Sequence, residues 1–171
     1  MERDSSKANV FCAISRRPVF GPFIFGEDSV HENVYLDMLI IWLIPQFAHE
    51  EVQGYIYQQD GTPPHWHKGV REYLNEHLPS RCVGPAAGRD NTACTWSPRS
   101  PDLTVCDFFL WGFAKDNVYV PPLPKTLPEV QERLNTAIGN VTQDVLWRVW
   151  REWEYRLDIC RVTRGAHIQC I

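Results

Sequence analysis

The sequence predicts a protein of the α/β or α+β class, and three observations predict it. Two apolar, β-prone segments, residues 9–14 and 19–25, lie near the start of the chain. A short apolar segment at 54–58 then leads directly into an acidic residue, Asp60. The rest of the chain is dominated by apolar residues at helical spacing. Strand-type and helix-type segments that alternate in this way are typical of mixed folds with a sheet covered by helices.

The composition fits a globular chain with one sizeable core. The 171 residues are 44% hydrophobic and carry a formal net charge of −4, and a chain of this length can bury a real core. Most proteins that bind DNA strongly present a basic surface, because phosphate neutralisation supplies much of their affinity. The acidic balance therefore argues against strong autonomous binding to DNA.

The six cysteines and the apolar runs exclude several classes of protein. No C-x-x-C unit occurs, so we expect no zinc site. We expect the cysteines to be free thiols in a nuclear or cytosolic protein that is not secreted. The longest apolar run, 38–44, is far shorter than the roughly 20 residues that span a bilayer, so we expect no membrane partner. The many aromatic residues predict an aromatic-rich core; the alternative is a platform on which bases stack.

The first half of the chain is expected to form a hairpin, a helix and a strand. The turn residues 16–18 would join the two β-prone segments. Asn33 is expected to cap a helix over 34–44, which Pro45 would end or kink.

The strand at 54–58 would lead into a second helix. The prolines at 63–64 would start a helix over about 65–78. Residues 79–95 show no periodicity, so we expect a loop that is long for a compact domain.

The second half is expected to be helical. A helix is predicted over 108–116, and the proline-rich segment 121–124 breaks the chain after it. We therefore place one domain at 1–120 and a helical extension packed on it at 121–171.

Two helices with recognisable caps make up this extension. Thr126 and Glu129 match a capping box that opens a helix to about residue 138. Thr142 would cap a further helix, whose apolar residues recur at steps of three and four and predict a packed face.

Two acidic residues are candidates for a divalent-metal site. Asp60 directly follows a predicted strand, at the end of the sheet where open sheets hold ligands. The alternative is that Asp60 and Gly61 simply form a common Asp-Gly turn. Asp107 lies among apolar residues, where a carboxylate must be paired, bound to metal or turned to solvent. Asp102 follows a proline and would cap the turn that comes after it. Two carboxylates far apart in the sequence permit a site with oxygen ligands for a hard cation.

The segment at 59–65 reads Gln-Asp-Gly-Thr-Pro-Pro-His, and the segment at 100–107 reads Ser-Pro-Asp-Leu-Thr-Val-Cys-Asp. These two sequence motifs resemble those of the mariner family of cut-and-paste DNA transposases. The resemblance implies a ribonuclease H-like α/β fold, with Asp60 as the second catalytic acid and Asp107 as the third. It also implies that Mg²⁺ or Mn²⁺ is the cofactor in intact relatives.

The chain departs from the family pattern in three ways. The family places its first acid on a strand ahead of residue 8, where this sequence offers only Glu2 and Asp4. We therefore expect a partial ribonuclease H-like fold without its first strand, and no catalytic activity. The loop at 79–95 is an enlargement, and the family's amino-terminal helix-turn-helix region has no counterpart in the sequence.

The functional expectation is a transposon-derived fragment that binds nucleic acid without cutting it. Arg148, Arg151 and Arg156 are the candidate DNA contacts, and further partners would be a second copy or other transposase chains. The alternatives are a domesticated DNA- or protein-binding module and a decaying, non-functional copy. His65 and His67 are interpreted as surface or packing residues, because two residues apart on a helix they do not share a face.

Overall fold

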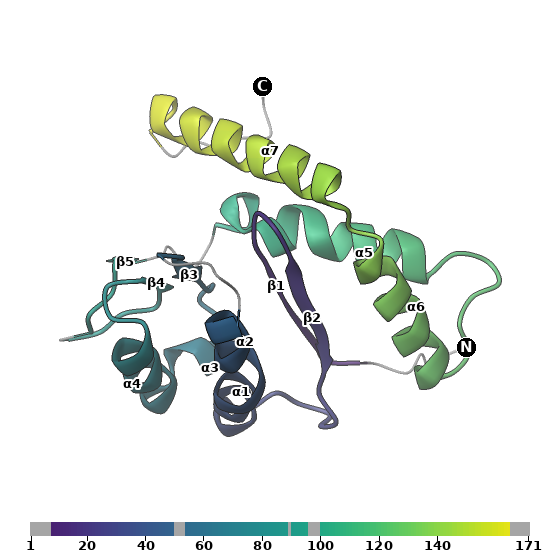
Figure 1. Ribbon diagram of the computed structural model, residues 1–171, viewed down its shortest axis with the longest axis horizontal. Coiled ribbons are helices and arrows are strands. Elements are labelled where there is room, and N and C mark those ends of the chain that lie inside the picture. The colour runs from purple at the N-terminus through teal and green to yellow at the C-terminus, as the bar shows by residue number, and fades with distance from the viewer. Residues whose placement is uncertain (1–7, 50–53, 89, 96–99, 165–171) are drawn as a thin grey trace. The chain divides into compact units, whose positions relative to one another are not determined.

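The computed structural model describes residues 8–49, 54–88, 90–95 and 100–164 (Figure 1). The chain forms two compact units. One combines residues 1–28 with 101–171, and we call it the hairpin unit; the other, residues 29–100, we call the Asp60 unit. Strands and helices occur in both, which confirms the expected α/β class. The expected domain boundary at residue 120 stays a prediction.

The hairpin unit begins with the predicted β-hairpin. Strand β1 (Val10–Ile14) pairs antiparallel with β2 (Val19–Ile24), and the register shifts once between Phe11 and Ala13. The Ser15 N–H donates to the Pro18 carbonyl at 3.0 Å and closes the turn. The hairpin prediction is therefore confirmed.

Helices of the second half cover this hairpin. A 3₁₀ turn (Pro101–Leu103) and a π-helical turn (Cys106–Leu110) lead into α5 (Trp111–Val118), followed by α6 (Leu127–Gly139) and α7 (Gln143–Val162). The predicted helix at 108–116 is thus present, but it starts as a π turn. The core between hairpin and helices consists of Cys12, Leu110, Ala114, Val118, Val130, Leu134 and Ile138.

Both predicted caps of the C-terminal helices are present. Thr126 Oγ1 accepts the Glu129 N–H at 3.3 Å, and the Glu129 carboxylate accepts the Lys125 N–H at 2.6 Å. Thr142 Oγ1 accepts the Val145 N–H at 3.4 Å. These bonds satisfy N–H groups that have no partner within the helix and fix where α6 and α7 begin.

The Asp60 unit opens with one long helical segment rather than a helix that stops at proline. It runs through α1 (Glu32–Met38), a π turn (Leu39–Leu43) and α2 (Ile44–His49). The cap is His31, so the prediction of Asn33 as the cap is wrong. Pro45 does not end the helical segment: it is the second residue of α2, and the last hydrogen bond of the π turn is donated by Ile44, the residue before it.

The predicted helix over 65–78 is interrupted. Helix α3 (Pro63–Trp66) and helix α4 (Lys68–His77) meet at His67, whose φ of −59° and ψ of 136° are extended. The strand β3 is also shorter than expected and spans only Tyr57–Gln58.

The expected loop at 79–95 contains two strands, so that prediction is wrong. Strand β4 (Cys82–Gly84) pairs parallel with β3 on one side and with β5 (Cys94–Thr95) on the other. The segment between them is tied to α4. Asp90 accepts the Ala87 N–H at 2.7 Å and the Asn75 amide at 3.2 Å, and it also pairs with Arg71. Among the described strands, no pairing joins this sheet to the hairpin.

The core is more aliphatic than the sequence predicted. The largest side chains that are fully buried are leucines and Val70, and most aromatic rings are half-buried or exposed. Trp147 is 58% exposed and Tyr155 is 56% exposed on α7. The cysteines within the described residues are free thiols: Cys12, Cys82, Cys94, Cys106 and Cys160. In the described part of the chain, no helix is long and apolar enough to cross a membrane.

Candidate metal centre

Asp60 is held by the turn that follows it. Its Oδ1 accepts the Thr62 N–H at 3.1 Å and the Thr62 hydroxyl at 2.9 Å, and it pairs with His65 Nδ1 at 2.8 Å. Within the described residues, every hydrogen bond and ion pair of this carboxylate falls on Oδ1. Oδ2 therefore remains the oxygen that can bind a cation, while Oδ1 fixes the orientation of the group.

His65 is the central partner of Asp60. Its Nδ1 also lies 3.0 Å from the Asp60 carbonyl oxygen. Both of these oxygens can only accept, so the geometry assigns a proton to Nδ1. The ring packs against Tyr35 with centroids 4.5 Å apart, and the side chain is 14% exposed. The histidine thus packs, as predicted, but it also orients the acid.

This arrangement stabilises the ionised form of Asp60. The hydrogen bond from His65 is the largest cause that lowers its pKa. Partial burial opposes it, and the two bonds from Thr62 add to it, so the pKa falls to about 2. A carboxylate that accepts several hydrogen bonds prefers to be charged. Asp60 is therefore an anion over the whole physiological pH range.

The backbone just before Asp60 is fixed by a buried polar network. The Tyr35 hydroxyl donates to Gln59 Oε1 at 3.0 Å and lies 2.9 Å from the Tyr57 hydroxyl. Burial raises the pKa of Tyr35 well above its usual value, so the phenol stays protonated. Gly84 on β4 makes room for Gln59, because a Cβ at this position would lie 2.8 Å from Gln59 Cγ.

Asp107 belongs to the hairpin unit and lies in the first part of the π turn Cys106–Leu110. Its N–H donates to the Thr104 carbonyl at 2.9 Å, and its side chain is exposed. Leu110, at the end of the same turn, is fully buried in the core. The turn therefore places the acid at the surface and anchors its far end in the interior.

The three candidate arginines of α7 do not share one face. Arg148 and Arg151 are exposed, and the Arg151 guanidinium lies 4.8 Å from the Trp147 ring centre. Arg156 is half-buried, because five residues further along a helix the side chain points about 140° away. It donates to the Asp102 carbonyl at 3.2 Å and to Glu152 at 2.9 Å.

Neither acid has a full set of metal ligands in its own surroundings. The described residues contain no group of three or more histidine, cysteine or acidic side chains that could hold a metal ion. A hollow of about 340 Å³ in the hairpin unit is lined by residues 117, 132, 133, 136, 137 and 140, and neither Asp60 nor Asp107 is among them. Asp60 and Asp107 belong to different compact units, so each acid is described in its own surroundings.

Comparison with solved structures identifies which known fold this order of strands and helices matches. The chain is similar to the catalytic domain of the Mos1 mariner transposase in a crystal structure, with a TM-score of 0.69 and 16% identity over 94% of this chain and 82% of that one. A structure of that domain with raltegravir and Mg gives a TM-score of 0.67 and 18% identity over 92% of this chain and 75% of that one.

The chain therefore has the fold of a mariner transposase catalytic domain. A further structure of the Mos1 domain, with raltegravir and Mn, matches with a TM-score of 0.67 and 15% identity over 94% of this chain and 82% of that one. No protein-family model matches the chain, and no curated protein matches it.

Proposed function

We propose that the chain is a transposase-derived domain that binds Mg²⁺ or Mn²⁺ through Asp60 and Asp107 and does not cut DNA. The state of Asp60 carries the proposal. This carboxylate stands at the end of a parallel strand, is ionised, is held through Oδ1 and keeps Oδ2 open. A hard divalent cation prefers oxygen ligands of this kind.

The surroundings of each residue indicate its role in binding the cation. Asp60 would offer Oδ2 to the cation, while His65 and Thr62 hold its other oxygen and keep it from rotating. Asp107 would offer a second carboxylate from the π turn. A bound divalent cation would polarise a phosphate oxygen and lower the pKa of its water.

Two carboxylates are fewer than the strand-cutting reaction requires. Clamping both the attacking and the leaving oxygen takes two metals about 3.5–4 Å apart, bridged by shared acids. The resemblance calls for three acids, and these 171 residues supply two that match its motifs. We therefore expect these 171 residues by themselves to bind a cation without cleaving a DNA strand.

Calorimetric titration with Mn²⁺ tests this proposal. We expect one weak site in the wild-type chain and none in Asp60→Asn or Asp107→Asn. Glu76→Gln on α4 and Asp116→Asn on α5 are the matched controls, because both acids are exposed and lie outside the candidate centre. Equal Mn²⁺ binding in all four variants would refute the assignment, as would nicking of plasmid DNA that depends on Asp107.

A second proposal concerns nucleic acid. Arg148 and Arg151 lie on the exposed side of α7 with the exposed Trp147, a combination suited to a phosphate and a base. The exposed acids of the same helix oppose strong binding, so we expect weak, salt-dependent affinity for DNA.

Titration of labelled single-stranded DNA at two salt concentrations tests this surface. Arg148→Ala with Arg151→Ala should weaken binding and flatten its salt dependence, whereas Arg156→Ala should not flatten it. Unchanged affinity in the double variant would exclude this face of α7.

A further inference from the structure

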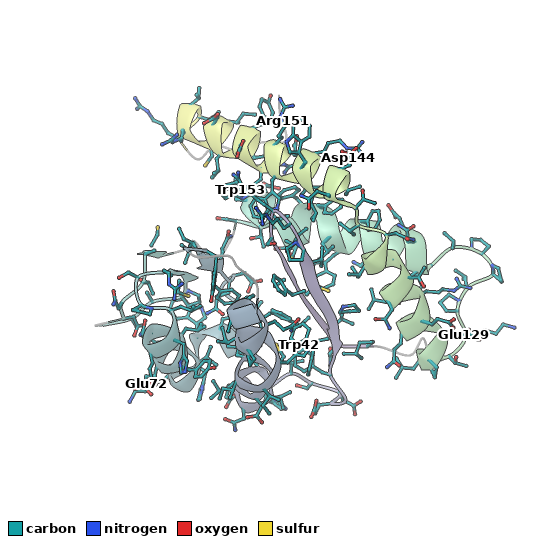
Figure 2. All side chains as sticks on the ribbon, viewed as in Figure 1. Trp42, Glu72, Glu129, Asp144, Arg151 and Trp153 are labelled. Atoms are coloured by element: carbon teal, nitrogen blue, oxygen red, sulfur yellow. The ribbon has the colours of Figure 1, made fainter. Side chains whose placement is uncertain are left out.

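Helix α7 reaches the turn that carries Asp107 through two side chains. The Trp153 indole N–H donates to the Leu103 carbonyl at 2.9 Å. Arg156 Nη1 donates to the Asp102 carbonyl at 3.2 Å. Both acceptors belong to the 3₁₀ turn just ahead of Asp107. Figure 2 shows Trp153 on the side of α7 toward the hairpin and Arg151 on the opposite side.

Arg156 makes a third contact directly beside the acid. Its guanidinium carbon lies 4.4 Å from the centre of the Phe108 ring, and Phe108 follows Asp107 in the chain. Glu152, one helical turn earlier, accepts from Arg156 Nε at 2.9 Å. The guanidinium is therefore held by a carboxylate behind it, a carbonyl and an aromatic face, which leaves it little freedom to turn toward solvent.

The helix that carries these side chains is itself anchored on the hairpin. Arg16, in the hairpin turn, pairs with Glu154 at 2.6 Å and lies over the Trp150 ring at 5.9 Å. Gln143 donates to the Arg16 carbonyl at 2.7 Å. Helix α7 thus links the hairpin turn to the segment 102–108 within the same unit.

We propose that Arg156 and Trp153 are positioning residues for Asp107: they fix the 3₁₀ turn and the start of the π turn so that the carboxylate keeps one orientation. This inference rests on the proposed role of Asp107 as a metal ligand. It also removes Arg156 from the candidate DNA contacts, because its donors are directed into the protein.

Amide hydrogen exchange tests the positioning role without any metal. The N–H groups of Asp107 and Phe108 donate to the Thr104 carbonyl at 2.9 and 3.1 Å, so their exchange reports opening of the turn. Trp153→Phe removes one N–H donor and keeps most of the ring, and Arg156→Met removes the guanidinium and keeps the stem. We expect each to accelerate exchange at 107 and 108 about tenfold, the effect of one lost hydrogen bond.

The buried residues Leu134 and Ile138 of α6 provide the internal reference for this experiment. Their exchange should stay unchanged in both variants. Arg148→Met is the matched control on the outer face of α7 and should leave 107 and 108 unchanged. Protection at 107 and 108 that is unchanged in Trp153→Phe would overturn the inference, even if Arg156→Met proved unfolded.

Mn²⁺ titration separates positioning from simple charge. Arg156 is a cation that lies over Phe108, the residue after Asp107, so removing its charge alone should tighten Mn²⁺ binding. Loss of positioning should weaken it instead, by several-fold, and Trp153→Phe should weaken it without any change of charge. Tighter binding in Arg156→Met together with wild-type affinity in Trp153→Phe would contradict the inference. If wild-type protein binds no Mn²⁺, the proposed function fails while hydrogen exchange still decides the positioning role.

Discussion

Asp60 and Asp107 are supported in opposite ways. All described partners of the Asp60 carboxylate come from the five residues that follow it. The turn that carries Asp107 is supported by Trp153 and Arg156, whose acceptors lie 50 and 54 residues earlier in the chain. The orientation of Asp60 therefore depends on a local turn, whereas that of Asp107 depends on how α7 packs within its unit. Substitutions should therefore affect the two acids separately.

The largest expected effect comes from the core beneath the Asp107 turn. Leu110→Ala leaves a cavity at a fully buried position and should lower the free energy of unfolding by about 3 kcal/mol. Urea denaturation followed by circular dichroism measures this loss. Leu123→Ala, at a leucine that is 54% exposed, should change stability little. If Leu110→Ala also changed the pKa of Asp60, the two acids would not be supported independently.

A smaller loss is expected beneath Asp60. Gly84→Ala would place a Cβ 2.8 Å from Gln59 Cγ, so the buried Gln59 side chain must shift, at a cost of about 1–3 kcal/mol. Gly112→Ala on α5 is the matched control, because nothing lies within 4 Å of its Cβ and alanine favours a helix. Thermal denaturation should show opposite signs for the two variants. Equal stability of Gly84→Ala and wild type would show that Gln59 is not constrained.

The local support of Asp60 also predicts a dependence on pH. The folded pKa of about 2 lies below the usual value of 3.8, so the ionised carboxylate stabilises the fold above about pH 4. This contribution is lost as the pH falls from about 4 to 2, and partial exposure limits it to roughly 1 kcal/mol.

His65→Phe should raise the pKa of Asp60 toward 3.8 and remove most of this acid-dependent stabilisation. An NMR titration of the Asp60 carboxyl carbon measures the shift directly. An unchanged pKa in this variant would show that Thr62 alone holds the charge.

The smallest expected effect lies on the surface of α4. Lys68 and Glu72 form an ion pair at 3.3 Å, but both side chains are largely exposed. Lys68→Ala should therefore cost no more than about 0.5 kcal/mol and should leave both acids unaffected. A larger loss of stability in a thermal melt would mean that the Lys68–Glu72 pair supports the fold more strongly than its exposure indicates.

The sequence predicted the elements whose signals are local. Thr126 and Thr142 each mark a helix start through a side-chain oxygen three residues before the N–H it accepts, and the hairpin follows from two β-prone runs around Pro18. The strands β4 and β5 were missed because three and two residues are too few to show periodicity. What holds them is pairing along the sheet and the contacts of Asp90, which no local pattern reveals.

The two candidate acids also differ in whether their supporting contacts can be predicted from local sequence. The motif at 59–65 contains Asp60, Thr62 and His65, so the whole support of this acid could have been found in the spacing of the three residues. The support of Asp107 could not, because it depends on which face of α7 meets the 3₁₀ turn. The step of five residues from Arg151 to Arg156 was a usable signal, since it separates the two guanidinium groups by more than a third of a turn.

Whether Asp60 and Asp107 bind the same cation is the central question, and backbone cleavage directed by bound Fe²⁺ answers it most directly. Fe²⁺ replaces Mg²⁺ at oxygen-rich sites, and with peroxide it cuts the chain close to where it is bound. We predict two sets of cuts, one near residue 60 and one near residue 107, and the loss of both in Asp60→Asn alone. Cuts near only one acid, or cuts near 107 that persist in Asp60→Asn, would contradict a shared site.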